Sequence, residues 1–72
     1  MRYYSTLRPV GIGTFPKPTE NKVLSIENFN SRIYVHEINH EAWGYIEYEK
    51  PLSEKEAQNY DLVSANEVVN KN

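Results

Sequence analysis

Apolar and aromatic residues are concentrated in the segment from Glu41 to Tyr48, which contains the single tryptophan of the chain. Side chains of an extended strand point alternately to its two faces. One face would carry Trp43, Tyr45 and Glu47, and the other Ala42, Gly44, Ile46 and Tyr48. Both faces therefore hold apolar or aromatic groups, which is typical of a strand covered on both sides. We predict that Trp43–Tyr48 is the central strand and that Trp43 lies in the core.

Three further segments have the alternation and the aromatic or β-branched residues of strands. They are Arg2–Leu7, Lys22–Phe29 and Arg32–His36. Asn30 and Ser31 separate the last two, and asparagine tolerates the left-handed backbone that tight hairpins need. These two strands are therefore expected to fold back on each other as an antiparallel hairpin.

A helix start is indicated by Ser53 and Glu56, which have the spacing of a capping box. Leu52 and Ala57 stand where a hydrophobic staple would form, so we predict a short helix from about Glu54 to Tyr60. Such a helix is too short to be stable alone and must dock on a sheet. The residues after it, 61–63, are expected to be extended.

These elements predict an α+β fold, a mainly antiparallel three- to four-stranded sheet with one short helix packed on it. Residues 1–64 would form a single domain, and residues 65–72 a flexible tail. The expected core comprises Tyr4, Leu24, Ile26, Ile33, Val35, Trp43, Tyr45, Ile46, Leu52, Ala57, Tyr60 and Leu62.

Composition limits the cellular location of the protein and the kinds of site that it can contain. The 72 residues include no cysteine, which excludes disulfides and thiolate metal sites and favours a cytoplasmic protein. No apolar run approaches the roughly 20 residues of a membrane helix, and the N-terminus lacks the apolar core of a signal peptide. A soluble protein with no membrane partner is expected.

Charge is distributed unevenly along the chain, whose net charge is −2. Residues 1–35 hold five Lys or Arg and two acidic residues, whereas residues 36–72 hold three Lys and eight acidic residues. Two outcomes are open: the folded molecule is electrically polar, or strand pairing brings the two halves together and cancels the asymmetry.

The segment His36–His40 matches the H-E-x-x-H motif of zinc hydrolases. That chemistry requires a helix, on which positions i and i+4 share a face, but Ile33, Tyr34 and Val35 before it favour a strand. We therefore interpret His36 and His40 as residues flanking a turn, and expect no metal or other cofactor. No pair of carboxylates is singled out for acid–base work, so no catalytic residue is assigned and the protein is not expected to be an enzyme.

The segment Pro9–Asn21 contains three of the four prolines and two of the three glycines, which predicts a long loop. Its Gly11-Ile12-Gly13 run lacks the rest of a dinucleotide or phosphate-binding fingerprint. We predict that the loop binds a protein partner, because prolines reduce the entropy lost on docking. Phe15 would be an exposed aromatic anchor, or alternatively would cover the end of the sheet. The residues assigned to partner binding are Arg8, Gly11, Gly13, Phe15 and Lys17.

Nucleic-acid binding is the alternative function. It would use basic side chains for phosphates and tyrosines as stacking platforms. The candidates are Arg2, Arg8, Lys17, Lys22 and Arg32 with Tyr3, Tyr4 and Tyr34. The chain is acidic overall and has no basic cluster, so this alternative ranks below protein binding.

Several segments together resemble one family. They are Tyr3-Tyr4-Ser5-Thr6 with Arg8-Pro9 and the loop that follows, Lys22-Val23-Leu24 with Ile26 and Asn28-Phe29, Glu41–Tyr48, and Pro51-Leu52. This pattern, over about residues 3–63, is similar to small proteins of phages and other mobile elements of low-GC Gram-positive bacteria that are related to the phage defence-against-restriction protein A. The resemblance implies a small non-catalytic accessory protein of a mobile element, one that protects incoming DNA or blunts a host defence. Its partner would be a host defence component or a phage structural protein.

Overall fold

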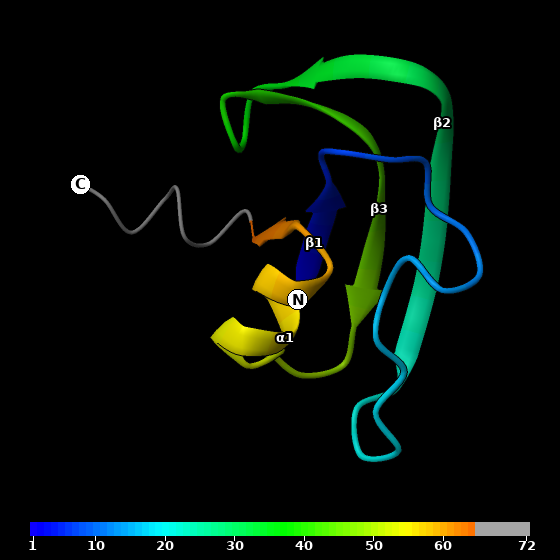
Figure 1. Ribbon diagram of the computed structural model, residues 1–72, viewed down its shortest axis with the longest axis vertical. Coiled ribbons are helices and arrows are strands. Elements are labelled where there is room, and N and C mark those ends of the chain that lie inside the picture. Colours follow the sequence, from blue (N-terminus) through cyan, green and yellow to red (C-terminus); the bar gives the residue numbers. More distant parts are fainter. Residues whose placement is uncertain (65–72) are drawn as a thin grey trace.

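The computed structural model describes residues 1–64, which form one four-stranded sheet and one helix (Figure 1). The elements in chain order are β1 (Arg2–Ser5), β2 (Val23–Val35), β3 (His40–Tyr48), α1 (Glu54–Asn59) and β4 (Leu62–Ser64). The strand order is β2-β3-β1-β4, and every neighbouring pair is antiparallel. The predicted α+β class is confirmed. The expectation of a flexible tail falls on residues 65–72, outside the described part of the chain.

The position of β3 inside the sheet confirms that the tryptophan-bearing segment is a central strand. It pairs with β2 on one side and with β1 on the other, where Tyr3 lies opposite Ile46 and Tyr4 opposite Tyr45. The short strand β4 pairs with the far side of β1. The first and last strands of the described chain are thus neighbours, and β2 forms the opposite edge.

The predicted hairpin at Asn30 and Ser31 is wrong, because both residues lie inside one 13-residue strand, β2. Asn28 pairs with Gly44 and Ile33 with Ala42, so residues 29–32 all lie opposite position 43 as a bulge. Asn30 does take a left-handed backbone, with φ of 61°. The conformation that asparagine tolerates is therefore used to bulge a strand, not to end one.

The hairpin that connects β2 to β3 is formed by residues 36–39. Val35 pairs with His40, and the backbone N–H groups of Ile38 and Asn39 donate to the carbonyl oxygens of Val35 and His36. Asn39 has φ of 52°, again left-handed. Ile38 is buried, so this turn is fixed to the sheet by an apolar side chain as well as by hydrogen bonds.

The helix begins as the sequence predicts. The Ser53 side chain accepts from the backbone N–H of Glu56, and the Glu56 carboxylate accepts from the backbone N–H of Ser53. The helix ends at Asn59, and Asp61 then turns the chain with φ of 56° into β4. Ala57 faces the sheet and is buried. This helix, the one found in the described residues, is too short to cross a membrane.

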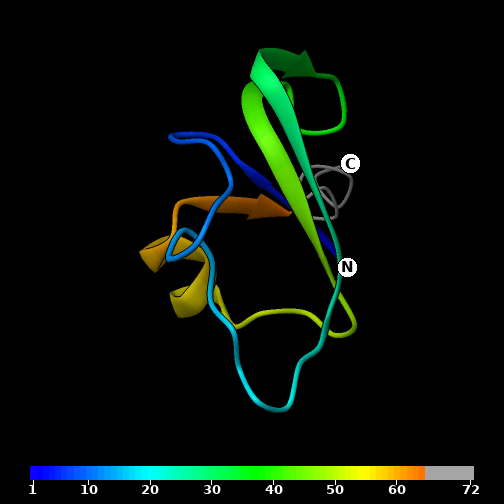
Figure 2. The ribbon, with the colours of Figure 1, turned by 90° about the vertical axis from the view of Figure 1, so that its right-hand side faces the viewer.

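The larger apolar cluster lies on the face of the sheet that carries α1 and the long loop before β2 (Figure 2). Its buried members are Tyr3, Val10, Phe15, Ile46, Tyr48, Leu52, Ala57 and Leu62. A second cluster joins Tyr4, Ile38 and Ala42, with the half-buried Phe29, Val35, Tyr45 and Val63 around it. Both clusters draw on β1 and β3, which are the two interior strands.

The predicted core needs correction at seven positions. Leu24, Ile26 and Ile33 are exposed, and Val35, Trp43, Tyr45 and Tyr60 are only half-buried. The reason for the first three is that β2 is an edge strand that extends beyond the area covered by the helix. Trp43 shares its face with Tyr45 as expected, but the face of β3 that is fully covered is the other one, with Ala42, Ile46 and Tyr48.

Candidate partner-binding loop

The segment between β1 and β2 is fixed to the rest of the molecule at intervals along its length. The Ser5 hydroxyl donates to the Arg8 carbonyl oxygen at 2.5 Å, and the Asn28 amide donates to the Val10 carbonyl oxygen at 2.8 Å. The buried Tyr48 hydroxyl donates to the Pro16 carbonyl oxygen at 2.5 Å. The loop therefore has a defined conformation in spite of its length.

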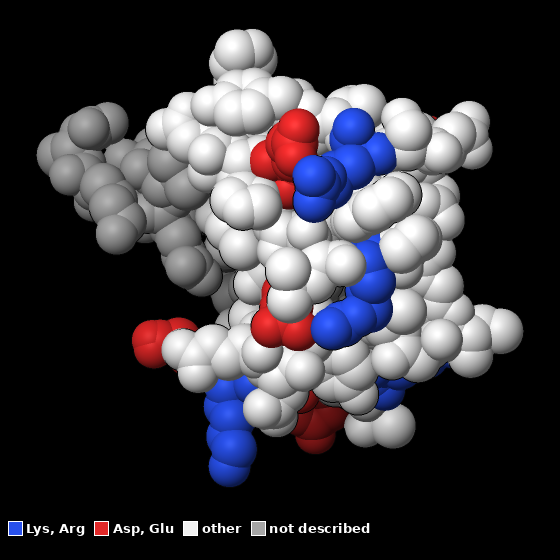
Figure 3. Space-filling view, turned by 45° about the horizontal axis from the view of Figure 1, so that its top comes forward, with Lys and Arg blue, Asp and Glu red and all other residues white. Residues whose placement is uncertain are grey.

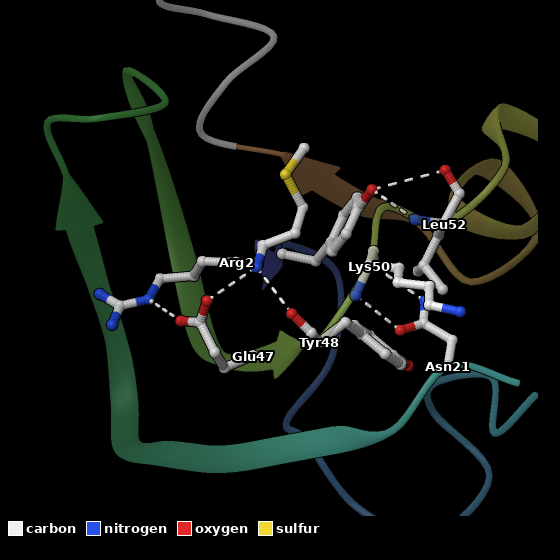
Figure 4. A network of polar contacts seen from close by, with 8 residues as sticks. Arg2, Asn21, Glu47, Tyr48, Lys50 and Leu52 are labelled. Carbon is white, nitrogen blue, oxygen red and sulfur yellow. Dashed lines mark hydrogen bonds and ion pairs between the residues drawn. The ribbon is translucent and has the colours of Figure 1, made fainter.

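The end of the loop is held by a reciprocal pair of hydrogen bonds. The Asn21 side chain donates to the Lys50 carbonyl oxygen at 2.7 Å and accepts from the Lys50 backbone N–H at 2.8 Å (Figure 4). Asn21 is buried, so these bonds satisfy both ends of its amide. They join the start of β2 to the turn that follows β3.

Phe15 lies in the core, with 6 % of its surface exposed. Of the two alternatives open from the sequence, the structure shows the second, in which Phe15 covers the sheet beside Tyr48 and Ile46. Val10 is buried in the same cluster. An anchoring role for Phe15 at a partner would require it to leave this cluster.

The most exposed large apolar residue between β1 and β2 is Ile12, with 96 % of its surface accessible, compared with 62 % for Leu7. It occupies the tip between the buried Val10 and Phe15. The Thr14 backbone N–H donates to the Gly11 carbonyl oxygen at 3.1 Å, and Gly13 has φ of +83°, as the third residue of a type II turn requires. The Thr14 hydroxyl adds two bonds to Gly11, to its N–H and to its carbonyl oxygen. The turn thus holds an isoleucine side chain out in solvent.

The two glycines of the tip have different roles. No atom lies within 4 Å of the place that a Cβ would occupy on Gly11 or on Gly13, so neither is required by packing. Gly13 is required by its backbone conformation, which side-chain-bearing residues rarely adopt. Gly13 therefore shapes the turn that carries Ile12, whereas Gly11 contributes to it through its backbone hydrogen bonds with Thr14.

The two basic residues assigned to the site lie at separate ends of the loop. The Arg8 guanidinium forms an ion pair with Asp61 at 3.0 Å, which ties the start of the loop to the turn after α1. The Lys17 ammonium lies 5.6 Å from the centre of the Phe15 ring. Both side chains are accessible at the rim of the loop, and their participation in partner binding stays a prediction.

The H-E-x-x-H segment is a hairpin turn, not the helix that a zinc hydrolase needs. His36 is in the turn and packs its ring against Tyr34, with 5.0 Å between the ring centres. His40 is the first residue of β3, and the Glu37 carboxylate accepts a 2.5 Å hydrogen bond from Tyr4. Within residues 1–64, no group of three or more His, Cys, Asp or Glu side chains could hold a metal ion.

Ion pairs join the basic first half of the chain to the acidic second half. Each of the four found in the described residues has its cation within residues 1–35 and its carboxylate within residues 36–72. They are Met1–Glu47, Arg2–Glu47, Arg8–Asp61 and Arg32–Glu41. Figure 3 shows Lys and Arg side chains directly beside Asp and Glu side chains on one face of the molecule. Of the two outcomes that the sequence left open, the structure shows the second, in which strand pairing offsets the charge asymmetry between the two halves. All three arginines have carboxylate partners.

Glu47 is the carboxylate with the densest set of partners. It accepts from the N-terminal ammonium of Met1 at 2.9 Å and from Arg2 at 3.1 Å (Figure 4). These contacts, with the ammonium as the larger cause, hold the pKa of Glu47 below its usual range. The Arg2 guanidinium also lies 3.9 Å above the centre of the Tyr45 ring. This arrangement fixes the start of β1 to β3 and leaves Arg2 engaged on two sides.

Burial raises the pKa of two tyrosines. Tyr48 is shielded from water inside the larger cluster, and Tyr4 is both desolvated and bonded to the Glu37 carboxylate. A phenol with a raised pKa stays neutral and keeps donating its hydrogen bond. Tyr4 and Tyr48 therefore act as structural donors. Because only 3 % of its surface is exposed, Tyr4 is not accessible for stacking on a base.

Ile12 is the residue that the sequence reasoning missed. The sequence held little signal for it, since Val10 and Phe15 lie two and three residues away and could share a strand or helix face with it. Phe15 drew attention because aromatic residues dominate interfaces. Aromatic residues dominate cores as well, and in a chain of this length the core takes precedence.

The fold and the loop describe a small α+β domain that presents an ordered surface loop. The family model for the C-terminal domain of defence against restriction A matches residues 1–67. The chain therefore belongs to this family and is a protein related to defence against restriction. No curated protein and no solved structure was found to match it.

Proposed function

We propose that this chain is a non-catalytic accessory protein of a phage or other mobile element, and that it acts in evasion of host defence by binding a protein. Its family supports the link to restriction. The target that fits this role is a component of the host defence, or a structural protein of the phage particle to which the chain is attached.

The observation that carries protein binding is the presentation of Ile12. An isoleucine that is 96 % exposed leaves its apolar surface in contact with water. Burying that surface against a partner would stabilise the complex by roughly 25 cal/mol per Å². The turn that presents it is already ordered by the Gly11–Thr14 hydrogen bonds, so little conformational entropy is lost on docking. The buried Val10 and Phe15 on either side keep the tip at a fixed place on the molecule.

The loop is better suited to a protein than to nucleic acid. The nearest basic residue before the tip, Arg8, is neutralised by Asp61, and Arg2 and Arg32 pair with Glu47 and Glu41. Nucleic-acid affinity depends on cations that are free to neutralise phosphates. An apolar tip with one rim lysine, Lys17, matches the apolar centre and polar rim of a protein interface.

The test is a restriction assay in cells that carry a restriction–modification system and express the chain. Wild type is expected to raise the transformation efficiency of unmodified plasmid relative to modified plasmid. Ile12→Glu should abolish this protection, because it places a charge at the centre of the contact, while Ile12→Val should retain it. Equal melting temperatures of the three proteins would show that the loss is not one of folding.

Two results would contradict the proposal. Protection by Ile12→Glu equal to that by wild type would exclude the loop tip as the contact. Binding of purified wild type to DNA, with an affinity that falls steeply as salt increases, would favour the nucleic-acid alternative.

A further inference from the structure

β2 is an edge strand that carries exposed apolar side chains. Within residues 1–64 no strand lies beyond it, so the backbone groups along its outer side are available for pairing. Leu24 is 56 % exposed and Ile26 48 % exposed. Exposed edges that carry apolar side chains are templates for the addition of another strand.

The first part of β2, together with Lys22 directly before it, is complementary in charge to a second copy of itself. The segment Lys22–Glu27 begins with a base, ends with an acid and has Val23 and Ile26 just inside these ends. In an antiparallel pair of two such segments, Lys22 of each copy lies opposite Glu27 of the other, and Val23 lies opposite Ile26. Both charged side chains are exposed, and neither takes part in an ion pair within residues 1–64.

The irregularity in β2 between Val23 and Ser25 makes this register possible. Val23 and Ile26 lie opposite Tyr48 and Ile46, two residues apart on β3, so both point to the same face of the sheet. Lys22 accepts a backbone hydrogen bond from Glu49, and Glu27 lies opposite Tyr45, four residues away, so these two also share a face. In a regular strand, residues three or five apart would point to opposite faces and could not be paired in this way.

We propose that two copies of this chain associate through their Lys22–Glu27 segments, at the start of β2, antiparallel about a two-fold axis between Leu24 and Ser25. Each contact then occurs twice, as in any isologous interface. Two Lys22–Glu27 pairs enclose two Val23–Ile26 pairs and the central Leu24 side chains, and the two sheets become one. The segment Lys22–Glu27 does not include Ile12, and a self-association equilibrium is measured without any host partner, so the inference goes beyond the proposed function and is tested without it.

The experiment is sedimentation equilibrium of the purified protein over a concentration series that reaches about 1 mM. Wild type is expected to show a reversible monomer–dimer equilibrium. Lys22→Glu and Glu27→Lys should each weaken it, by about tenfold in the dimer dissociation constant, because each places like charges opposite one another twice. The double variant Lys22→Glu/Glu27→Lys restores opposite charges and should dimerise as wild type does.

A matched control is Lys55→Glu, which reverses an exposed lysine on α1, away from β2, and should leave the dissociation constant unchanged. Circular dichroism of every variant checks that it is folded. A wild type that is monomeric over the whole series would overturn the proposal. A dimer that is indifferent to both single reversals, or that the double variant fails to restore, would exclude this register.

Discussion

The backbone of Glu27 occupies the place that a side chain at Gly44 would need. A Cβ on Gly44 would lie 2.2 Å from the Glu27 carbonyl oxygen and 3.1 Å from the Asn28 Cα. Both neighbours are backbone atoms of β2, which cannot move aside as the end of a flexible side chain can. Glycine at the centre of β3 is therefore what allows β2 to approach so closely just before it bulges.

Gly44→Ala should accordingly be one of the most damaging single substitutions in the chain. We expect the free energy of unfolding to fall by about 3 kcal/mol or more, because β2 must shift to accommodate the methyl group. Urea unfolding followed by circular dichroism measures this. Gly11→Ala is the matched control, since a Cβ there meets no atom within 4 Å. A Gly44→Ala protein as stable as Gly11→Ala would show that the approach of β2 is not a constraint.

Tyr48 connects the core to the long loop through its hydroxyl. Its side chain is fully buried, its ring meets Tyr3 edge-on at 5.8 Å between centres, and its hydroxyl donates to the Pro16 carbonyl oxygen. Tyr48→Phe keeps the ring but leaves that oxygen without its donor, which should lower the free energy of unfolding by about 1–3 kcal/mol. Tyr34→Phe removes an exposed bond to Asn39 and should change it by about 0.5 kcal/mol at most. Equal effects of the two substitutions, measured in urea, would contradict this assignment.

The pKa of Glu47 predicts how stability depends on pH. Its pKa is lowered in the folded state by Met1 and Arg2, so its ionised form stabilises the fold above the pKa of the unfolded chain. This contribution is lost as the pH falls through the folded-state pKa. Glu47→Gln should therefore lower the free energy of unfolding by about 1 kcal/mol at pH 7, and the difference from wild type should shrink in acid.

The measurement is urea unfolding of both proteins from pH 7 down to the acid range, with any tag at the C-terminus so that the Met1 ammonium stays free. Glu49→Gln is a suitable control, because Glu49 is exposed and takes part in no ion pair among the described residues. A gap between wild type and Glu47→Gln that stays constant with pH would argue against the ion pairs as its cause.

Local signals in the sequence predicted those elements whose determinants are local. The Ser53–Glu56 capping box fixes the start of α1 by bonds between residues three apart. The alternation in β3 likewise separated its two faces correctly. Asn30 shows the limit of such signals, because a left-handed asparagine serves a hairpin or a bulge equally well. Whether Asn30 forms a hairpin or a bulge depends on β3, which pairs with β2 on both sides of the bulge and lies later in the chain.

The candidate site was predictable as a segment but not residue by residue. The prolines and glycines of Pro9–Asn21 indicated a loop, and its turn at Gly11–Thr14 follows from them. Which apolar side chain faces solvent depends on the partners that β2 and β3 offer. The Asn28 side chain of β2 bonds to the Val10 carbonyl oxygen, and the Tyr48 hydroxyl of β3 bonds to the Pro16 carbonyl oxygen beside Phe15. Long-range contacts of this kind leave no periodic pattern in the loop itself.

The histidines of the H-E-x-x-H segment give the last prediction, which concerns zinc. His36 and His40 lie on a hairpin, and the Glu37 carboxylate between them already accepts from the Tyr4 hydroxyl. A metal that binds the native state tightly raises its melting temperature. We expect added Zn²⁺ to leave the melting temperature of the protein, previously treated with chelator, unchanged, and His36→Ala and His40→Ala to melt as wild type does. Elemental analysis that finds one zinc per chain, lost in both variants, would overturn this expectation and restore the hydrolase interpretation.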